Sequence, residues 1–91
     1  MKTYTIDWER ECAMAENLTF AEMLDTLAQL VADDYNEFDN DDFYAIIEEY
    51  YIDEYDEEGE QTNGADSRAD VFLGGEDYCA LCDKIRDLIN A

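Results

Sequence analysis

The stretch from Glu11 to Ser67 contains 19 aspartates and glutamates and no lysine or arginine. The five basic residues all lie outside it, at Lys2, Arg10, Arg68, Lys84 and Arg86. The formal net charge of the chain is −21, whereas a magnitude of about 2 to 8 keeps a small domain soluble. Because these carboxylates repel one another in a compact state, the fold has to be held by apolar packing, and the excess charge indicates a basic partner.

The apolar content is high enough for a folded chain. Hydrophobic residues make up 47% of the sequence, including seven tyrosines, four phenylalanines and one tryptophan, and disordered chains are poor in such residues. A chain of 91 residues has room for one modest core, so residues 1–91 are predicted to form a single acidic domain. The predicted fold class is mainly α, a bundle of three or four helices, with α+β as the alternative.

Two segments have clear helix signals. The first begins at Phe20, after a capping box of Thr19 and Glu22, and continues with apolar residues at the helical period. The second follows the chain break at Gly74-Gly75, where Asp77 can serve as the N-cap. Each of these helices is expected to bury one apolar face in the core.

A further helix is predicted from a cap at Asp39 or Asn40 through Asp53, with an almost purely anionic outer face. Ile52 would lie near the middle of that anionic face if the helix stayed regular. The sequence leaves open whether the helix distorts there or an apolar side chain is exposed.

Short strands are compatible with the pattern at two places. Residues Tyr4–Trp8 alternate apolar and polar as a strand does, although Asp7 could instead cap a brief helix. Val71–Leu73 returns to the core after an exposed, turn-rich loop and is the second candidate strand.

The acids are densest from Asp33 to Glu60, where 14 of 28 residues are acidic. At the helical rise this is roughly one charge per 3 Å, close to the spacing of about 3.4 Å along a DNA strand. Interleaved tyrosines suit arginine-rich sites through cation–π contacts. The predicted partner-binding residues are three tyrosine anchors and the acids around them: Asp33, Asp34, Tyr35, Glu37, Asp39, Asp41, Asp42, Tyr44, Glu48, Glu49, Asp53, Glu54, Tyr55, Asp56, Glu57, Glu58 and Glu60.

In size and composition the chain resembles the DNA mimics of phages and mobile elements, the anti-restriction and anti-CRISPR inhibitors, which are small, acidic and rich in acidic and aromatic helices. The resemblance is one of character and carries no residue roles, because no motif is shared. It implies a non-enzymatic inhibitor that evades host defence by occupying the nucleic-acid-binding site of a CRISPR effector or restriction enzyme. The alternative is an acidic adaptor or antitoxin-like protein that neutralises a basic partner.

Other functions fit the sequence poorly. Repulsion opposes direct contact with a nucleic acid or an anionic membrane. The absence of a signal or membrane segment predicts the cytoplasm, which is that of the host if the chain is phage-encoded. No motif indicates an enzyme or a cofactor, and the calcium-loop spacing is missing, which leaves only a weak divalent-cation buffer as a third possibility. Both a monomer and a homodimer are compatible with the sequence.

The three cysteines, Cys12, Cys79 and Cys82, do not make a disulfide framework, which agrees with a reducing compartment. Cys79 and Cys82 form a lone C-x-x-C that cannot complete a tetrahedral zinc site in a chain without histidine. Neighbouring acids would also raise the thiol pKa rather than lower it. Cys82 is therefore expected in the core and Cys79 at its edge, with no metal bound.

Overall fold

The computed structural model describes residues 1–9, 12–38, 41–63 and 67–91. Three antiparallel strands, β1 (Thr3–Trp8), β2 (Cys12–Leu18) and β3 (Tyr50–Tyr55), form a sheet in the order β2-β1-β3. Tyr4 and Ile6 are buried on one face of β1, and Ile6 pairs with the fully buried Ile52 of β3. The sheet thus has one apolar face that helices have to cover.

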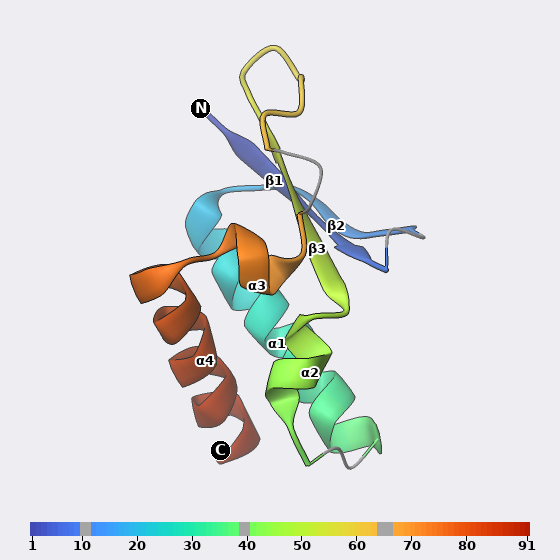
Figure 1. The fold of residues 1–91 in the computed structure, drawn as a ribbon, viewed down its shortest axis with the longest axis vertical. Helices are drawn as coiled ribbons and strands as arrows, with labels where there is room; N and C mark the ends of the chain where they lie inside the picture. Colours follow the sequence, from blue (N-terminus) through green and yellow to red (C-terminus); the bar gives the residue numbers. More distant parts are fainter. Residues whose placement is uncertain (10–11, 39–40, 64–66) are drawn as a thin grey trace.

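The helices are α1 (Phe20–Phe38), α2 (Phe43–Ile47), α3 (Ala69–Phe72) and α4 (Gly75–Ile89). Figure 1 shows α1 between α4 and α2, with the C-terminal half of α1 extending beyond the sheet. The buried side chains of the sheet and helices form one apolar cluster, and its largest members with almost no exposed surface are Ile6, Met23, Leu27, Ile47, Ile52, Leu73, Leu81 and Ile85.

The predicted mainly α class is wrong, and the fold is α+β. The error lies in the predicted helix through Asp53, because α2 ends at Ile47 and the chain continues as β3. Aromatic and β-branched residues from Tyr50 to Ile52 favour a strand. Pairing with β1 also buries Ile52 completely, whereas a continued helix would have left it among the acids.

The N-terminal strand is confirmed as β1, so the alternative helix capped by Asp7 is wrong. The strand predicted at Val71–Leu73 is also wrong. This segment belongs to α3 and the residue after it, and the helical spacing buries Ala69 and Leu73 while Val71 stays half exposed. A strand would have placed Val71 and Leu73 on the same face.

The helix starts agree in part with the sequence. The capping box of α1 is confirmed, since the Thr19 amide donates to Glu22 Oε1 (2.9 Å) and the Glu22 amide donates to Thr19 Oγ1 (3.1 Å). The Asp77 cap is wrong, because α4 begins earlier, with Gly74 at its N-cap. Asp39 and Asn40 lie outside the described residues, and α2 is capped by Asp42.

The molecule is elongated, with extents of 39 × 25 × 20 Å. The loop after β3 projects at one end of the long axis, and the C-terminal end of α1 lies near the other, beside α2 (Figure 1). The acidic segment from Asp33 to Glu60 therefore runs along most of the molecule, and its parts occupy different surroundings.

Candidate partner-binding surface

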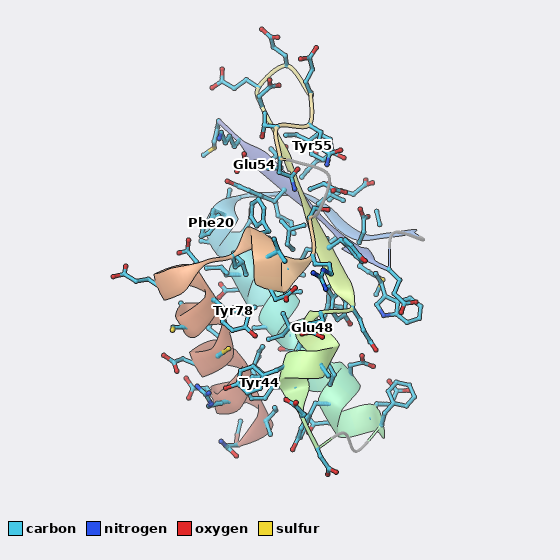
Figure 2. All side chains as sticks on the ribbon, viewed as in Figure 1. Phe20, Tyr44, Glu48, Glu54, Tyr55 and Tyr78 are labelled. Atoms are coloured by element: carbon cyan, nitrogen blue, oxygen red, sulfur yellow. The ribbon has the colours of Figure 1, made fainter. Side chains whose placement is uncertain are left out.

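The predicted contact residues fall into two largely exposed groups, and the residues between them are used by hydrogen bonds within the fold. The first group, here called the acidic end, lies on the last turns of α1, on the segment before α2 and on the turn into β3: Asp33, Asp34, Glu37, Asp41, Asp42, Glu48 and Glu49. The second, here called the tip, is the loop after β3: Asp56, Glu57, Glu58 and Glu60. Figure 2 shows Glu48, which directly follows α2, well away from Glu54 and Tyr55 near the tip. Asp39 lies outside the described residues, and the even helical row of charges expected from the sequence is not formed.

The acidic end opposes the dipole of α1. Asp33, Asp34 and Glu37 lie near the C-terminus of this helix, and its last turn contains no basic residue. A helix C-terminus carries partial negative charge, so carboxylates there are unfavourable. Asp33 Oδ1 accepts one hydrogen bond, from Gln29 Nε2 (2.8 Å). The stability of α1 therefore does not explain why three acids are placed here.

The carboxylates of the acidic end also influence a buried tyrosine. Burial, followed by the negative charges of Asp34, Glu49 and Asp33, raises the pKa of Tyr50 to about 12. Carboxylates from α1 and from the turn before β3 thus act on the same hydroxyl. Within the described residues, the Asp34 and Glu49 side chains form no hydrogen bond or ion pair.

The tip is organised by its own backbone. Asp56 Oδ1 accepts hydrogen bonds from the amides of Glu58 (2.9 Å) and Glu60 (3.0 Å), and Gly59 supplies the left-handed turn residue (φ 85°). An ion pair with the amino terminus lowers the pKa of Glu57. The carboxylates of Asp56, Glu58 and Glu60 are close enough to share a cation. Glu58 and Glu60 are exposed, however, and Asp56 Oδ1 already accepts the two hydrogen bonds of the turn.

Asp53 and Glu54 are engaged inside the fold and are not free to contact a partner. Asp53 is 4% exposed and accepts hydrogen bonds from Gln61 Nε2 (3.1 Å) and Ser67 Oγ (3.3 Å). The half-buried Glu54 accepts hydrogen bonds from a threonine, a lysine and a tyrosine: Thr62 Oγ1 (2.6 Å), Lys2 Nζ (3.1 Å) and Tyr4 Oη (3.1 Å). The hydrogen bond from Thr62 is the main cause of a lowered Glu54 pKa, and Lys2 and Tyr4 add to it.

Replacing Glu54 by glutamine is expected to destabilise the protein at pH 7 by about 1 to 3 kcal/mol, the usual range for hydrogen bonds to a charged acceptor. Because folding lowers this pKa below its ordinary 4.5, the stabilisation is complete above that pH and is lost as the pH falls through the folded pKa. Urea unfolding curves of the two proteins should thus differ at pH 7 and converge in acid. Glu58→Gln at the exposed tip is the control, and equal losses in both variants would contradict the role of Glu54.

The three predicted tyrosine anchors are largely used by the fold. Tyr35 packs against the core cluster, and Tyr55 is half buried where β3 forms a bridge with Gln61. Tyr44 accepts a hydrogen bond from Arg86 Nη2 (2.5 Å) and stacks on Tyr78, at 6.5 Å between ring centroids, which joins α2 to α4. These contacts mainly stabilise the fold, so the tyrosine rings are not fully free to contact a partner.

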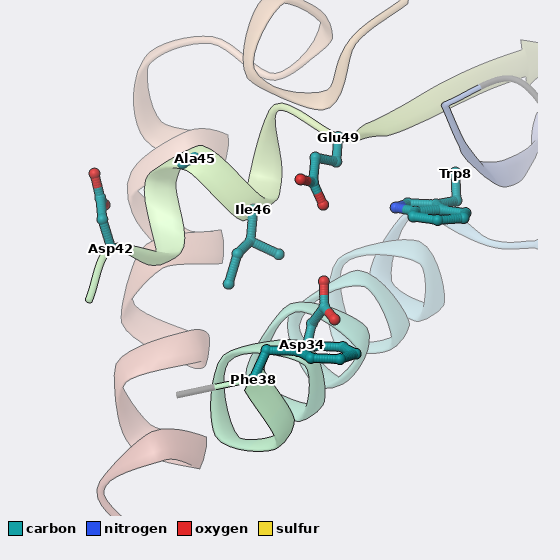
Figure 3. A pocket seen from close by; sticks show the side chains of 7 residues that line it. All are labelled: Trp8, Asp34, Phe38, Asp42, Ala45, Ile46 and Glu49. Atoms are coloured by element: carbon teal, nitrogen blue, oxygen red, sulfur yellow. The ribbon is translucent and has the colours of Figure 1, made fainter. Parts of the chain in front are cut away.

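Two exposed aromatic residues were missed from the predicted site. Trp8 is 38% exposed and Phe38 is 65% exposed, and both line a cavity of about 310 Å³ at the acidic end (Figure 3). The alternation of Tyr4, Ile6 and Trp8 in the sequence already indicated that Trp8 points to the helical side. Phe38 stands within the acidic stretch, but its proximity to Trp8 depends on the tertiary fold.

Three basic side chains of the described residues are neutralised within the fold by ion pairs: Lys2–Glu54 (3.1 Å), Lys84–Asp25 (2.6 Å) and Arg86–Asp83 (3.2 Å). None of these three pairs uses a carboxylate of the acidic end. The predicted placement of Cys82 in the core is confirmed, and burial raises its thiol pKa, whereas Cys79, predicted at the edge of the core, is exposed. The side chain of Cys12 lies outside the described residues.

Comparison of the chain with protein-family models, curated proteins and solved structures finds no match in any of the three. Among the helices of the described residues, none has both the length and the hydropathy needed to cross a membrane. A function for this chain is therefore argued from the chemistry of its surface.

Proposed function

We propose that this chain is a non-enzymatic inhibitor that binds a basic, nucleic-acid-binding protein at the site where the sugar-phosphate backbone would lie. Host defence nucleases, such as restriction enzymes and CRISPR effectors, are the proposed targets, and the host cytoplasm is the proposed place of action. The acidic end is the contact surface, and the tip is a second point of attraction at the far end of the molecule.

The observation that carries the proposal is the acidic end itself. Seven carboxylates are grouped there, near the ends of α1 and α2 and before β3, although Glu37 lies in the last turn of α1, where the helix dipole disfavours it, and Asp33 and Asp34 lie about one turn before it. Such an arrangement reduces the stability of the free protein, because like charges repel and the helix end is disfavoured. The best explanation for a surface that lowers the stability of the free protein is a partner whose lysines and arginines neutralise it.

The same physics governs a phosphate-binding groove. Lysine and arginine side chains in such a groove neutralise the phosphates and release the counterions that were condensed on the nucleic acid. The affinity therefore falls steeply as the salt concentration rises. A carboxylate surface held on a packed scaffold can take the place of the phosphates, and long-range attraction speeds the encounter. Shape complementarity then selects one nuclease from the many basic proteins in a cell.

A displacement assay tests this proposal. Restriction enzymes and CRISPR effectors are loaded with fluorescently labelled target DNA, and the chain is added while anisotropy is recorded. Release of DNA from at least one nuclease near equimolar ratio is expected, with a weaker effect as salt is raised. Binding without release would favour the acidic adaptor or antitoxin-like alternative, and no binding to any member of the panel would contradict the proposal.

A further inference from the structure

The cavity between β1, α1 and α2 combines aromatic walls with converging charge. Figure 3 shows the carboxylates of Asp34 and Glu49 pointing toward one another, with Trp8 on one side, Ile46 on the other and Phe38 nearby. The neighbouring Asp42 is directed away from this centre, and its carboxylate accepts a hydrogen bond from the Tyr44 amide (2.9 Å). Two carboxylates and two rings are thus left facing the same space.

The cavity walls are held by regular structure. Trp8 pairs with Tyr50 in the sheet, and the amide of Glu9 donates to the carbonyl of Glu49 (2.9 Å), which extends the β1–β3 ladder by one bond. Asp34 and Phe38 lie one helical turn apart on α1 and so share a face. The aromatic and acidic groups are therefore positioned before any partner arrives.

We propose that this cavity binds the guanidinium group of an arginine of the partner protein, held between Trp8 and Phe38 and neutralised by Asp34 and Glu49. This inference rests on the proposed function, because the arginine belongs to the basic partner. It adds a specific anchor to a surface that would otherwise act through charge alone.

The chemistry of the walls favours arginine over other cations. A guanidinium is planar and weakly hydrated, stacks on aromatic faces and offers five donors that can serve two carboxylates at once. Its methylene stem can lie along Ile46. A calcium ion would need six to eight oxygen ligands, whereas Figure 3 shows two carboxylates directed into the cavity. The compact, strongly hydrated ammonium of lysine gains less from the rings.

The single tryptophan of the chain lines the cavity and reports its occupancy directly. The probes are N-acetylarginine amide, its uncharged isostere N-acetylcitrulline amide and N-acetyllysine amide, each titrated at physiological salt while Trp8 fluorescence is recorded. The arginine probe should bind saturably with a Kd of about 1 to 10 mM, as expected for one side chain without the rest of the interface. Equal binding of the citrulline or lysine probe would overturn the assignment of a guanidinium site.

Charge-neutralising variants distinguish binding in the cavity from attraction by the overall negative charge of the protein. The pair Asp34→Asn and Glu49→Gln should weaken the arginine probe at least tenfold. The matched pair Asp87→Asn and Glu16→Gln changes the net charge equally, at exposed positions outside the acidic end, and should have an effect of less than threefold. An equal loss in both pairs would overturn the proposal, and circular dichroism of each variant verifies that the fold is intact.

The displacement assay distinguishes the failure of this inference from the failure of the proposed function. If the wild-type chain releases DNA and the Asp34→Asn and Glu49→Gln pair releases it equally well, the anchor is overturned while the mimicry stands. If the arginine probe binds as expected but no nuclease releases its DNA, the mimicry is overturned. A shift of Trp8 fluorescence with protein concentration alone would assign the arginine to a second copy of this chain and overturn the partner proposed here.

Discussion

Replacing Asp33, Glu37, Asp41 and Glu48 by lysine is expected to abolish DNA displacement while leaving the fold intact. An exposed ion pair contributes up to about 1 kcal/mol, and reversal replaces an attraction by a repulsion, so four reversals should weaken the complex about a thousandfold. The free protein should be as stable as before or more so. Its net charge changes from −21 to −13, because each reversal adds two positive charges. One of the replaced acids, Glu37, also lies in the last turn of α1, where the helix dipole disfavours a carboxylate. Displacement titrations and thermal melts measure the two effects separately.

A matched variant controls for net charge. Reversal of Glu16, Glu76, Asp77 and Asp87, which are exposed on β2 and α4, also gives −13 but leaves the acidic end unchanged. The control variant should displace DNA roughly tenfold less well, because only the long-range attraction is reduced. The effect is small because salt at physiological concentration screens this attraction strongly. Equal losses in the two variants would mean that total charge, and not its position at the acidic end, controls binding. Retained activity in the first variant would move the contact surface elsewhere.

Local signals in the sequence were sufficient for some elements of this fold. The start of α1 was predictable, because Thr19 and Glu22 satisfy each other's backbone amides within four residues. The strand from Thr3 to Trp8 was recognisable from its alternation. β3 was not, because the residues from Phe43 to Tyr51 fit an amphipathic helix, and Ile52 alone was out of phase with it. Only pairing with the distant β1 decides for a strand.

The candidate site shows the same division between local and tertiary information. Acids near the end of α1 were expected to face solvent, and Asp33 and Glu37 do so. Asp53 was predicted to contact a partner, but it is buried and its carboxylate accepts hydrogen bonds from Gln61 and Ser67. The cavity between Trp8 and Phe38 joins residues distant in the sequence, so composition alone could not reveal it. The density of acidic residues was therefore predictable from the sequence, whereas the arrangement of their carboxylates in space was not.

Raising the pH from 10 to 12 is expected to unfold the protein cooperatively. Burial is the main cause that raises the pKa values of Tyr4, Tyr50 and Tyr78 from 10 to about 12, and nearby carboxylates, together with Cys82 beside Tyr78, add to it. The raised values mean that folding favours the neutral hydroxyls, so their stabilisation is complete below pH 10 and is lost as the pH rises through 12. Two pKa units at each of three sites amount to about 8 kcal/mol, which is comparable to the whole stability of a small domain.

Circular dichroism and tyrosinate absorbance should therefore change together in the alkaline titration, because the buried hydroxyls ionise only as the chain unfolds. Tyr50→Phe keeps the ring and removes one ionising group, so its unfolding midpoint should move to higher pH. An unchanged midpoint would contradict the role of Tyr50. Ionisation of all seven tyrosines near pH 10, before any loss of helical signal, would show that the acids and the core do not restrain these hydroxyls. In the expected outcome, the carboxylates proposed to attract a partner also keep the Tyr50 hydroxyl protonated.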